Sequence, residues 1–450
     1  MSTSLADLRA RVVAQKTLIP SLYGGIDFDI TPERFADHID DECSLPEKFS
    51  RKYRAAVLAD KERLERARAY TMLGDTVADA YAALMPEHGF RRLIGMLTEA
   101  CDKGIDQVAD APQELVDFIV AMERIPDWLD MDLVNEGARV QRISMANLAP
   151  FAIRGAFIAT FMNKYSGLPM ALTGTLSNEN SVQRVKETAS FFTTATLPGA
   201  LERFGSGFKA AAMVRLMHSM VRFNIIKRSK IWDSRIYGIP IPQVDQMPAG
   251  TMPAFITAFK LIRQGRKEFT PRERAMVELC RYQSYLLGLP EELLPDTPQG
   301  IFDVMVTYGF TLRDGYDDET CGALVRATMA AYLPPDKSLR SRVFNSFEKG
   351  FSKVFFSRVF LRDDEKNLAA KMGVEPSIKD YLFFTASNLY ILPRMAAFTL
   401  LDKVPIAGKA ADQLLIHRLN KLLVSYGHAE YTTDPSKYKE AAPANVAKPV

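Results

Sequence analysis

A single histidine within a long apolar stretch has the clearest potential for chemistry in this sequence. Residues 207–229, GFKAAAMVRLMHSMVRFNIIKRS, predict one helix. Val214, His218, Val221 and Ile225 recur at helical spacing, so they share one face. The imidazole of His218 is therefore expected in the middle of an otherwise apolar stripe.

Two arginines accompany this histidine. Arg215 lies three residues before His218 and Arg222 four residues after it, so all three project to neighbouring sides of the helix. A buried imidazole between two guanidinium groups suits the binding of a metal inside an anionic, flat and apolar cofactor. The same pattern also fits a hydrogen-bonded histidine with a purely structural role.

A second candidate group precedes this helix. Arg184, Glu187 and Thr188 share one face of a helix that is expected to start near Ser181. That face continues into two phenylalanines, Phe191 and Phe192. The spacing is compatible with a surface ion pair beside apolar anchors, and equally with a polar cluster that lines a pocket.

Composition limits the classes of protein that fit the chain. Its 450 residues are 47% hydrophobic and 25% charged, which is typical of a globular protein with a sizeable core. A net charge of +3 gives no reason to expect a nucleic-acid partner. Four scattered cysteines form no CxxC or Cys/His cluster, so neither a zinc site nor a disulfide framework is expected.

The chain shows no targeting or membrane-spanning signal. MSTSLADLRARVVAQK, at the N-terminus, has no apolar core, so a cytoplasmic protein is expected. The longest apolar stretch, 144–175, contains Arg154 and Lys164, which makes a spanning helix unfavourable. Peripheral membrane contact stays open. The Phe-rich segment 341–360 would either lie on a membrane surface or, the interpretation we favour, cover an apolar pocket.

Helical periodicity dominates the sequence and alternating strand patterns are nearly absent, so an all-α fold is predicted. We expect an N-terminal helical layer over 1–110 and a catalytic domain over 111–430. The final segment, 431–450, is polar and rich in Pro, Ala and Lys, which predicts a disordered tail.

Five segments occur in a fixed order along the chain: PDWLD (126–130) with Gly137, LTGTL (172–176), the pair Arg184 and Thr188 with Thr188 thirty residues before His218, VRLMHSMVR (214–222), and YGIPIPQVDQMPAGT (237–251). Together they resemble the motifs of one family, the latex-clearing rubber oxygenases and the related MpaB-type oxygenases that cleave a prenyl side chain. Each motif is weak alone, but their common order is specific.

The resemblance implies a haem b protein with a globin-like helical core around the haem. His218 would be the proximal iron ligand. Arg215 and Arg222 would hold the haem propionates or brace the helix. Arg184 and Thr188 would lie on the distal side, near the position where dioxygen binds.

Two positions depart from the family pattern. Rubber oxygenases have a lysine immediately before the distal threonine, whereas this chain has Glu187. A carboxylate is a poor substitute for an amine ligand but a plausible general base if its pKa is tuned by burial and by Arg184. Pro242 replaces the asparagine of the Pro-Ile-Asn-Gln loop. Both departures, with the missing export signal, favour a substrate smaller than polyisoprene.

The sequence therefore predicts a haem-dependent oxygenase that acts with dioxygen on an apolar alkene of isoprenoid or lipid type, with cleavage of the C=C bond as the candidate reaction and Glu187 as the candidate base. Two alternatives belong to other classes. One is a non-catalytic helical carrier of lipids or isoprenoids, and the other is a haem protein for sensing or electron transfer.

Overall fold

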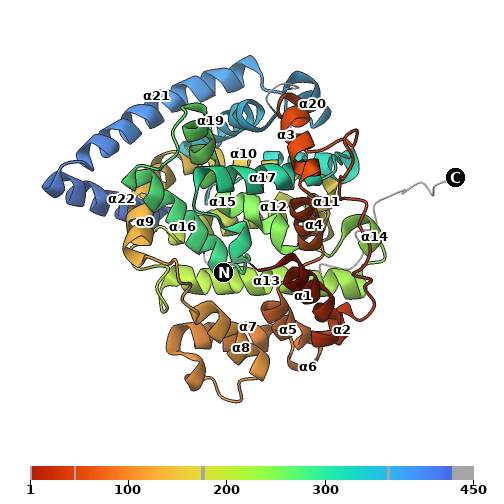
Figure 1. Cartoon of the computed structure of the whole chain (residues 1–450). Coiled ribbons are helices and arrows are strands. Elements are labelled where there is room, and N and C mark those ends of the chain that lie inside the picture. Colours follow the sequence, from red (N-terminus) through yellow and green to blue (C-terminus); the bar gives the residue numbers. More distant parts are fainter. Residues whose placement is uncertain (1–2, 45–46, 174–177, 362–364, 428–450) are drawn as a thin grey trace. The chain divides into compact units, whose positions relative to one another are not determined.

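The computed structural model describes residues 3–44, 47–173, 178–361 and 365–427. Over these residues the chain is helical and forms no β-strand, which confirms the predicted all-α class (Figure 1). Two isolated backbone bridges, Phe35–Leu312 and Cys43–Arg313, are the only extended pairings among these residues.

The chain divides into two compact units. Unit 1 comprises Met1–Arg142 and Phe191–Asp314. Its helices are α1 (Leu5–Leu18), α2 (Pro20–Tyr23), α3 (Glu47–Ala59), α4 (Lys61–Tyr70), α5 (Thr76–Ala83), α6 (Met85–His88), α7 (Phe90–Lys103), α8 (Gln113–Glu123), α13 (Ser206–Arg228), α14 (Ser234–Tyr237), α15 (Gln243–Arg263), α16 (Pro271–Leu286) and α17 (Pro298–Thr311), with short 3-10 turns at Ile105–Gln107 and Glu291–Leu293.

Unit 2 comprises Ile143–Ser190 and Gly315–Val450. Its helices are α10 (Ala149–Ala159), α11 (Lys164–Leu172), α18 (Ala323–Ala330), α19 (Leu339–Phe356), α20 (Glu365–Lys371), α21 (Ile378–Leu401) and α22 (Pro405–Tyr426), with π-helical turns at Asp318–Gly322 and Ser357–Leu361. Two helices, α9 (Met131–Asn147) and α12 (Asn178–Thr194), contribute residues to both units.

The helix predicted over 207–229 is observed as α13. Its N-cap is Gly205, and its last turn carries Lys227 and Arg228. Their positive charges interact favourably with the negative C-terminal end of the helix dipole. Within unit 1, α13 packs against α5, α7 and α16, so most of its side chains are buried. The helix is buried on several sides and not only on the single apolar stripe seen in the sequence.

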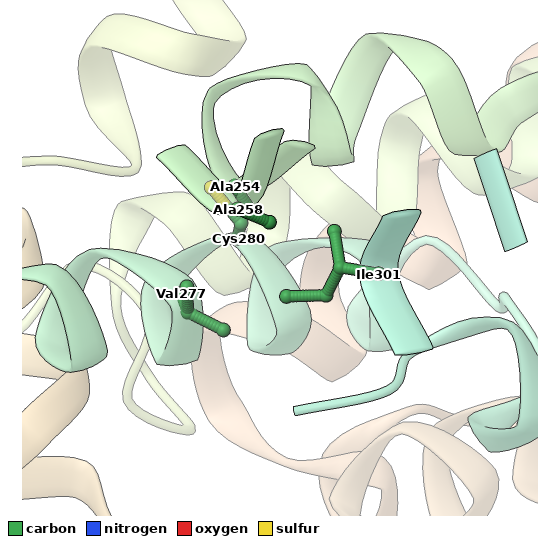
Figure 2. Packing of buried hydrophobic residues seen from close by; sticks show 5 residues of the cluster. All are labelled: Ala254, Ala258, Val277, Cys280 and Ile301. Atoms are coloured by element: carbon green, nitrogen blue, oxygen red, sulfur yellow. The ribbon is translucent and has the colours of Figure 1, made fainter. Parts of the chain in front are cut away.

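The clearest core of unit 1 joins three helices beside α13. Ala254 and Ala258 of α15 meet Val277 and Cys280 of α16 and Ile301 of α17, as Figure 2 shows. Small residues on α15 let the helix axes approach closely. This packing fixes α15, whose first turn carries residues of the candidate site.

Unit 2 is organised around α19, which packs between α10 and α21. Phe351 of this helix lies against Ala152 and Ile391. Arg154 and Glu348 form a buried ion pair (2.7 Å), and Arg154 also donates to the carbonyl oxygen of Ala331 (2.8 Å) at the end of α18. The Phe-rich segment 341–360 is therefore mainly an internal packing element.

Three further expectations from the sequence concern membrane spans, the domain boundary and the C-terminal tail. No helix among the described residues combines the length and apolarity needed to cross a bilayer. The boundary predicted near residue 110 stays a prediction. The predicted tail, 431–450, lies outside the described residues, as do residues 174–176 of the LTGTL motif.

One glycine is required by a close helix contact. A Cβ atom at Gly137 of α9 would overlap the carbonyl oxygen of Ala275 in α16 and would lie 2.9 Å from the Cβ atom of Leu279. By contrast, a Cβ atom at Gly95, in the middle of α7, would meet nothing within 4 Å. These two helical glycines therefore form a matched pair.

We predict that Gly95→Ala raises the free energy of unfolding by about 0.5–1 kcal/mol, because alanine is the better helix former. Gly137→Ala should instead lower it by about 1–3 kcal/mol, because the added methyl group forces the two helices apart. Urea unfolding of both variants gives the comparison. Equal stabilisation by the two substitutions would contradict the close α9–α16 contact.

Candidate functional site

His218 forms a hydrogen bond with a side chain of another helix, α15. Its Nδ1 atom lies 2.9 Å from Oε1 of Gln246, and the imidazole is partly buried. The amide nitrogen of Gln246 in turn donates to Oε1 of Gln243 (3.0 Å), which fixes the amide with its oxygen toward the histidine. Because Gln246 offers an acceptor, Nδ1 carries the proton and Nε2 carries the lone pair of the neutral ring.

Local backbone structure explains why these glutamines are in place. Pro242 is the N-cap of α15, and Gln243 begins the helix, so Gln243 and Gln246 lie one turn apart on one face. The backbone nitrogen of Gln243 donates to the carbonyl oxygen of Leu73 (2.9 Å). The start of α15 is thereby tied to the segment that precedes α5.

Arg215 and Arg222 both pair with carboxylates of α5. Arg215 Nη2 lies 2.9 Å from Oδ1 of Asp75, and its Nε atom contacts the other oxygen. Arg222 pairs with Asp79, and both of these side chains are fully buried. These contacts tie α13 to Asp75 and Asp79, and both roles foreseen for the two arginines, bracing the helix and binding the propionates, stay predictions.

The acidic partners are themselves positioned by local interactions. Asp75 caps α5 by accepting a hydrogen bond from the backbone nitrogen of Ala78 (3.2 Å). Asp79 accepts a hydrogen bond from the hydroxyl of Tyr23 (2.5 Å). Burial raises the pKa of the Asp79 carboxyl, and the adjacent Arg222 opposes that rise. Burial, together with Asp79, likewise raises the pKa of the Tyr23 hydroxyl.

Arg222 also holds the loop that follows α14. Its Nε atom donates to the carbonyl oxygen of Pro240 (2.9 Å), and its Nη2 atom donates to that of Ile241. Ile241 has a φ of +49°, an unfavourable backbone conformation for a β-branched residue. The guanidinium group therefore stabilises a strained turn directly before α15.

A second buried pair anchors α15 from its other side. Arg34 Nη1 lies 2.9 Å from Oδ2 of Asp245, and the hydroxyl of Tyr308 lies 3.3 Å from Oδ1. Burial raises the pKa of the Tyr308 hydroxyl well above its usual value, and the charge of Asp245 adds to the rise. Asp245 therefore serves to hold the first turn of α15.

The candidate residues of α12 form a compact polar group. Glu187 is buried, and its Oε2 atom lies 2.9 Å from Nη1 of Arg184. Its Oε1 atom accepts a hydrogen bond from Gln183 (2.9 Å). Thr188 lies half-buried on the same helix. The structure thus brings Arg184 and Glu187 into direct contact, as their spacing predicts.

Sequence reasoning missed three residues of the site, Gln246, Asp75 and Asp79. Gln246 lies within the matching segment 237–251, and its spacing of three from Gln243 was the available signal. Nothing near Asp75 and Asp79 in the sequence marks them as partners of arginines about 140 residues away.

No group of three or more His, Cys, Asp or Glu side chains is arranged to hold a metal ion in the part of the chain that the structure describes. A cavity of about 430 Å³ in unit 1 is lined by residues of α4 and α17 together with Arg34, and by none of the six predicted site residues.

A family model described as "ER-bound oxygenase mpaB/B'/Rubber oxygenase, catalytic domain" matches residues 144–335, a range that includes all six predicted site residues. No curated protein matches the chain.

The fold is similar to that of a solved structure, the latex clearing protein in its closed state. The TM-score is 0.53, with 16% sequence identity over 79% of this chain and 91% of the other. This likeness concerns the fold alone. The family model confirms the resemblance predicted from the sequence: residues 144–335 of this chain are similar to the catalytic domain of the MpaB and rubber oxygenase family.

Proposed function

We propose that this protein is a haem b-dependent oxygenase that uses dioxygen to oxidise, by C=C cleavage, an apolar alkene of isoprenoid or lipid type. The observation that carries the proposal is the His218–Gln246 hydrogen bond within an oxygenase-family domain. It supplies the feature that the sequence left open, an acceptor that fixes the histidine tautomer.

The residues at His218 fit a haem. The macrocycle of a haem supplies the other ligands of the metal, so the protein is expected to provide a single imidazole. The Nδ1–H···Oε1 bond to Gln246 places the lone pair at Nε2, the atom that would bind iron. When bound, the haem supplies the iron chemistry that activates dioxygen.

The role of the protein on this side is to orient the ligand. Gln246 sets the rotation of the imidazole ring and raises its basicity. Arg215 and Arg222, one turn to either side of His218, prevent α13 from rotating or sliding. A carboxylate of the cofactor that reached Arg215 would have to share it with Asp75.

Glu187 is the proposed base. Hydrogen bonds from Arg184 and Gln183 hold the carboxylate in one orientation. A carboxylate has about four acceptor positions, so Oε1 or Oε2 can accept a proton from an allylic carbon without losing these bonds. Thr188 is the proposed polar neighbour, and Phe191 and Phe192 of the same helix, with ring centroids 5.2 Å apart, supply apolar surface.

We predict that the purified protein, supplied with haem, shows a haem absorption band. His218→Ala should lose most of the bound haem, because no other axial ligand is assigned, and added imidazole should restore the band. His417→Ala, on the exposed side of α22, serves as the control and should keep the spectrum of the unmodified protein.

Absence of haem uptake by the unmodified protein would overturn the proposal, and lipid copurifying with such a protein would support the carrier alternative. An unchanged spectrum in His218→Ala would assign iron ligation to another residue.

We predict that Glu187→Gln keeps its haem but loses activity by about 10²–10⁴-fold, because the amide cannot accept the proton. Dioxygen uptake with squalene as the alkene probe measures the effect. Glu202→Gln, at an exposed glutamate, is the matched control and should leave uptake unchanged.

Equal uptake by Glu187→Gln and the unmodified protein would remove the role of Glu187 as base. A haem-loaded protein that consumes no dioxygen with alkene probes would favour sensing or electron transfer.

A further inference from the structure

The C-terminal helical hairpin of unit 2 packs on the rest of the unit through its inner side. It consists of α21, the turn at 402–404 and α22, and the two helices meet at that turn in Figure 1. On its inner side, Ile391 packs against Phe351, and Phe398 packs with Leu415. These contacts make the hairpin part of the folded unit.

Its outer side is unusually apolar. Among the described residues, 23 large apolar side chains are exposed, and 12 of them lie in this hairpin between Ile378 and Val424. More than half of these exposed side chains are thus concentrated in one hairpin, and such a concentration marks a binding surface, whereas isolated exposed residues would be scattered over the molecule.

Four of these exposed side chains gather where the hairpin turns. Leu400 is 63% exposed at the end of α21, and Ile406 is 86% exposed at the start of α22, with Val404 and Leu401 between them. Leu400 and Leu401 point about 100° apart around the helix axis. The turn therefore presents aliphatic side chains in several directions, as a convex end and not as a flat face.

Basic residues surround this end. Lys403 and Lys409 are exposed beside the aliphatic side chains. Over 377–427 the chain has six basic residues (Lys379, Arg394, Lys403, Lys409, Arg418, Lys421) and three acidic ones (Asp380, Asp402, Asp412), a net charge of +3. Long lysine side chains keep their charge in the headgroup layer while neighbouring aliphatic groups enter the acyl region.

We propose that the α21–α22 turn docks on an anionic lipid bilayer, with Leu400, Leu401, Val404 and Ile406 inserted and Lys403 and Lys409 on the lipid phosphates. A second copy of the chain is the less favourable occupant, because two such ends would bring like charges together and their convex shapes would bury little area. This inference does not rest on the proposed oxygenase function.

The test is sedimentation of the full chain with vesicles of equal parts phosphatidylcholine and phosphatidylglycerol. The double variant Leu400→Ser/Ile406→Ser should bind about 100-fold more weakly, since each lost aliphatic side chain weakens partitioning by about tenfold. The matched control is Ile125→Ser/Ile256→Ser, which changes two exposed isoleucines of unit 1 and should bind like the unmodified chain.

A second pair of measurements separates the charge from the apolar contribution. Lys403→Gln/Lys409→Gln should weaken binding to these vesicles and leave binding to pure phosphatidylcholine unchanged. Circular dichroism and thermal unfolding should be the same for all variants, because every altered side chain is exposed.

Three results would overturn the proposal. The first is an unmodified chain that does not sediment with the anionic vesicles. The second is a Leu400→Ser/Ile406→Ser variant that binds as tightly as the unmodified chain. The third is a dimer in solution that this variant converts to a monomer, without vesicle binding by either, which would identify a second copy as the occupant.

Discussion

The buried ion pair between Arg222 and Asp79 is the interaction on which the candidate site depends most. Both side chains are fully buried, so each charge needs the other to offset its loss of hydration. Arg222 also binds the carbonyl oxygens of Pro240 and Ile241, and Asp79 also binds Tyr23. One guanidinium group thus joins α13, α5 and the turn before α15. Removing either partner would cost about 3–5 kcal/mol, because an uncompensated charge would remain in the interior.

The geometry of His218 follows from that constraint. Arg215 and Arg222 fix α13 on either side of the histidine, and Arg34 and Tyr308 fix the first turn of α15 through Asp245. With both helices held, and with the amide of Gln246 held by Gln243, His218 Nδ1 and Gln246 Oε1 lie at hydrogen-bond distance (2.9 Å). An imidazole held in this way keeps one tautomer and one ring orientation, which an axial iron ligand requires.

The local parts of the candidate site could be predicted from the sequence, whereas its long-range contacts could not. Local periodicity was sufficient for α13 and for the Arg184–Glu187 contact, because residues three or four apart are neighbours on a helix surface. The partners of Arg215 and Arg222 could not be predicted, since Asp75 and Asp79 are brought to them only by tertiary packing over about 140 residues. For the same reason, periodicity alone did not show that the Phe-rich α19 is internal whereas the apolar α21–α22 turn is exposed.

The account is tested most directly by the iron–histidine stretching band in the resonance Raman spectrum of the ferrous, haem-loaded protein. We predict that the unmodified protein has this band and that Gln246→Leu moves it to lower frequency, because the imidazole loses its acceptor and becomes a weaker donor to iron. A band at the same frequency in both proteins, or no band from an iron–histidine bond, would contradict the assignment of His218 as an iron ligand oriented by Gln246.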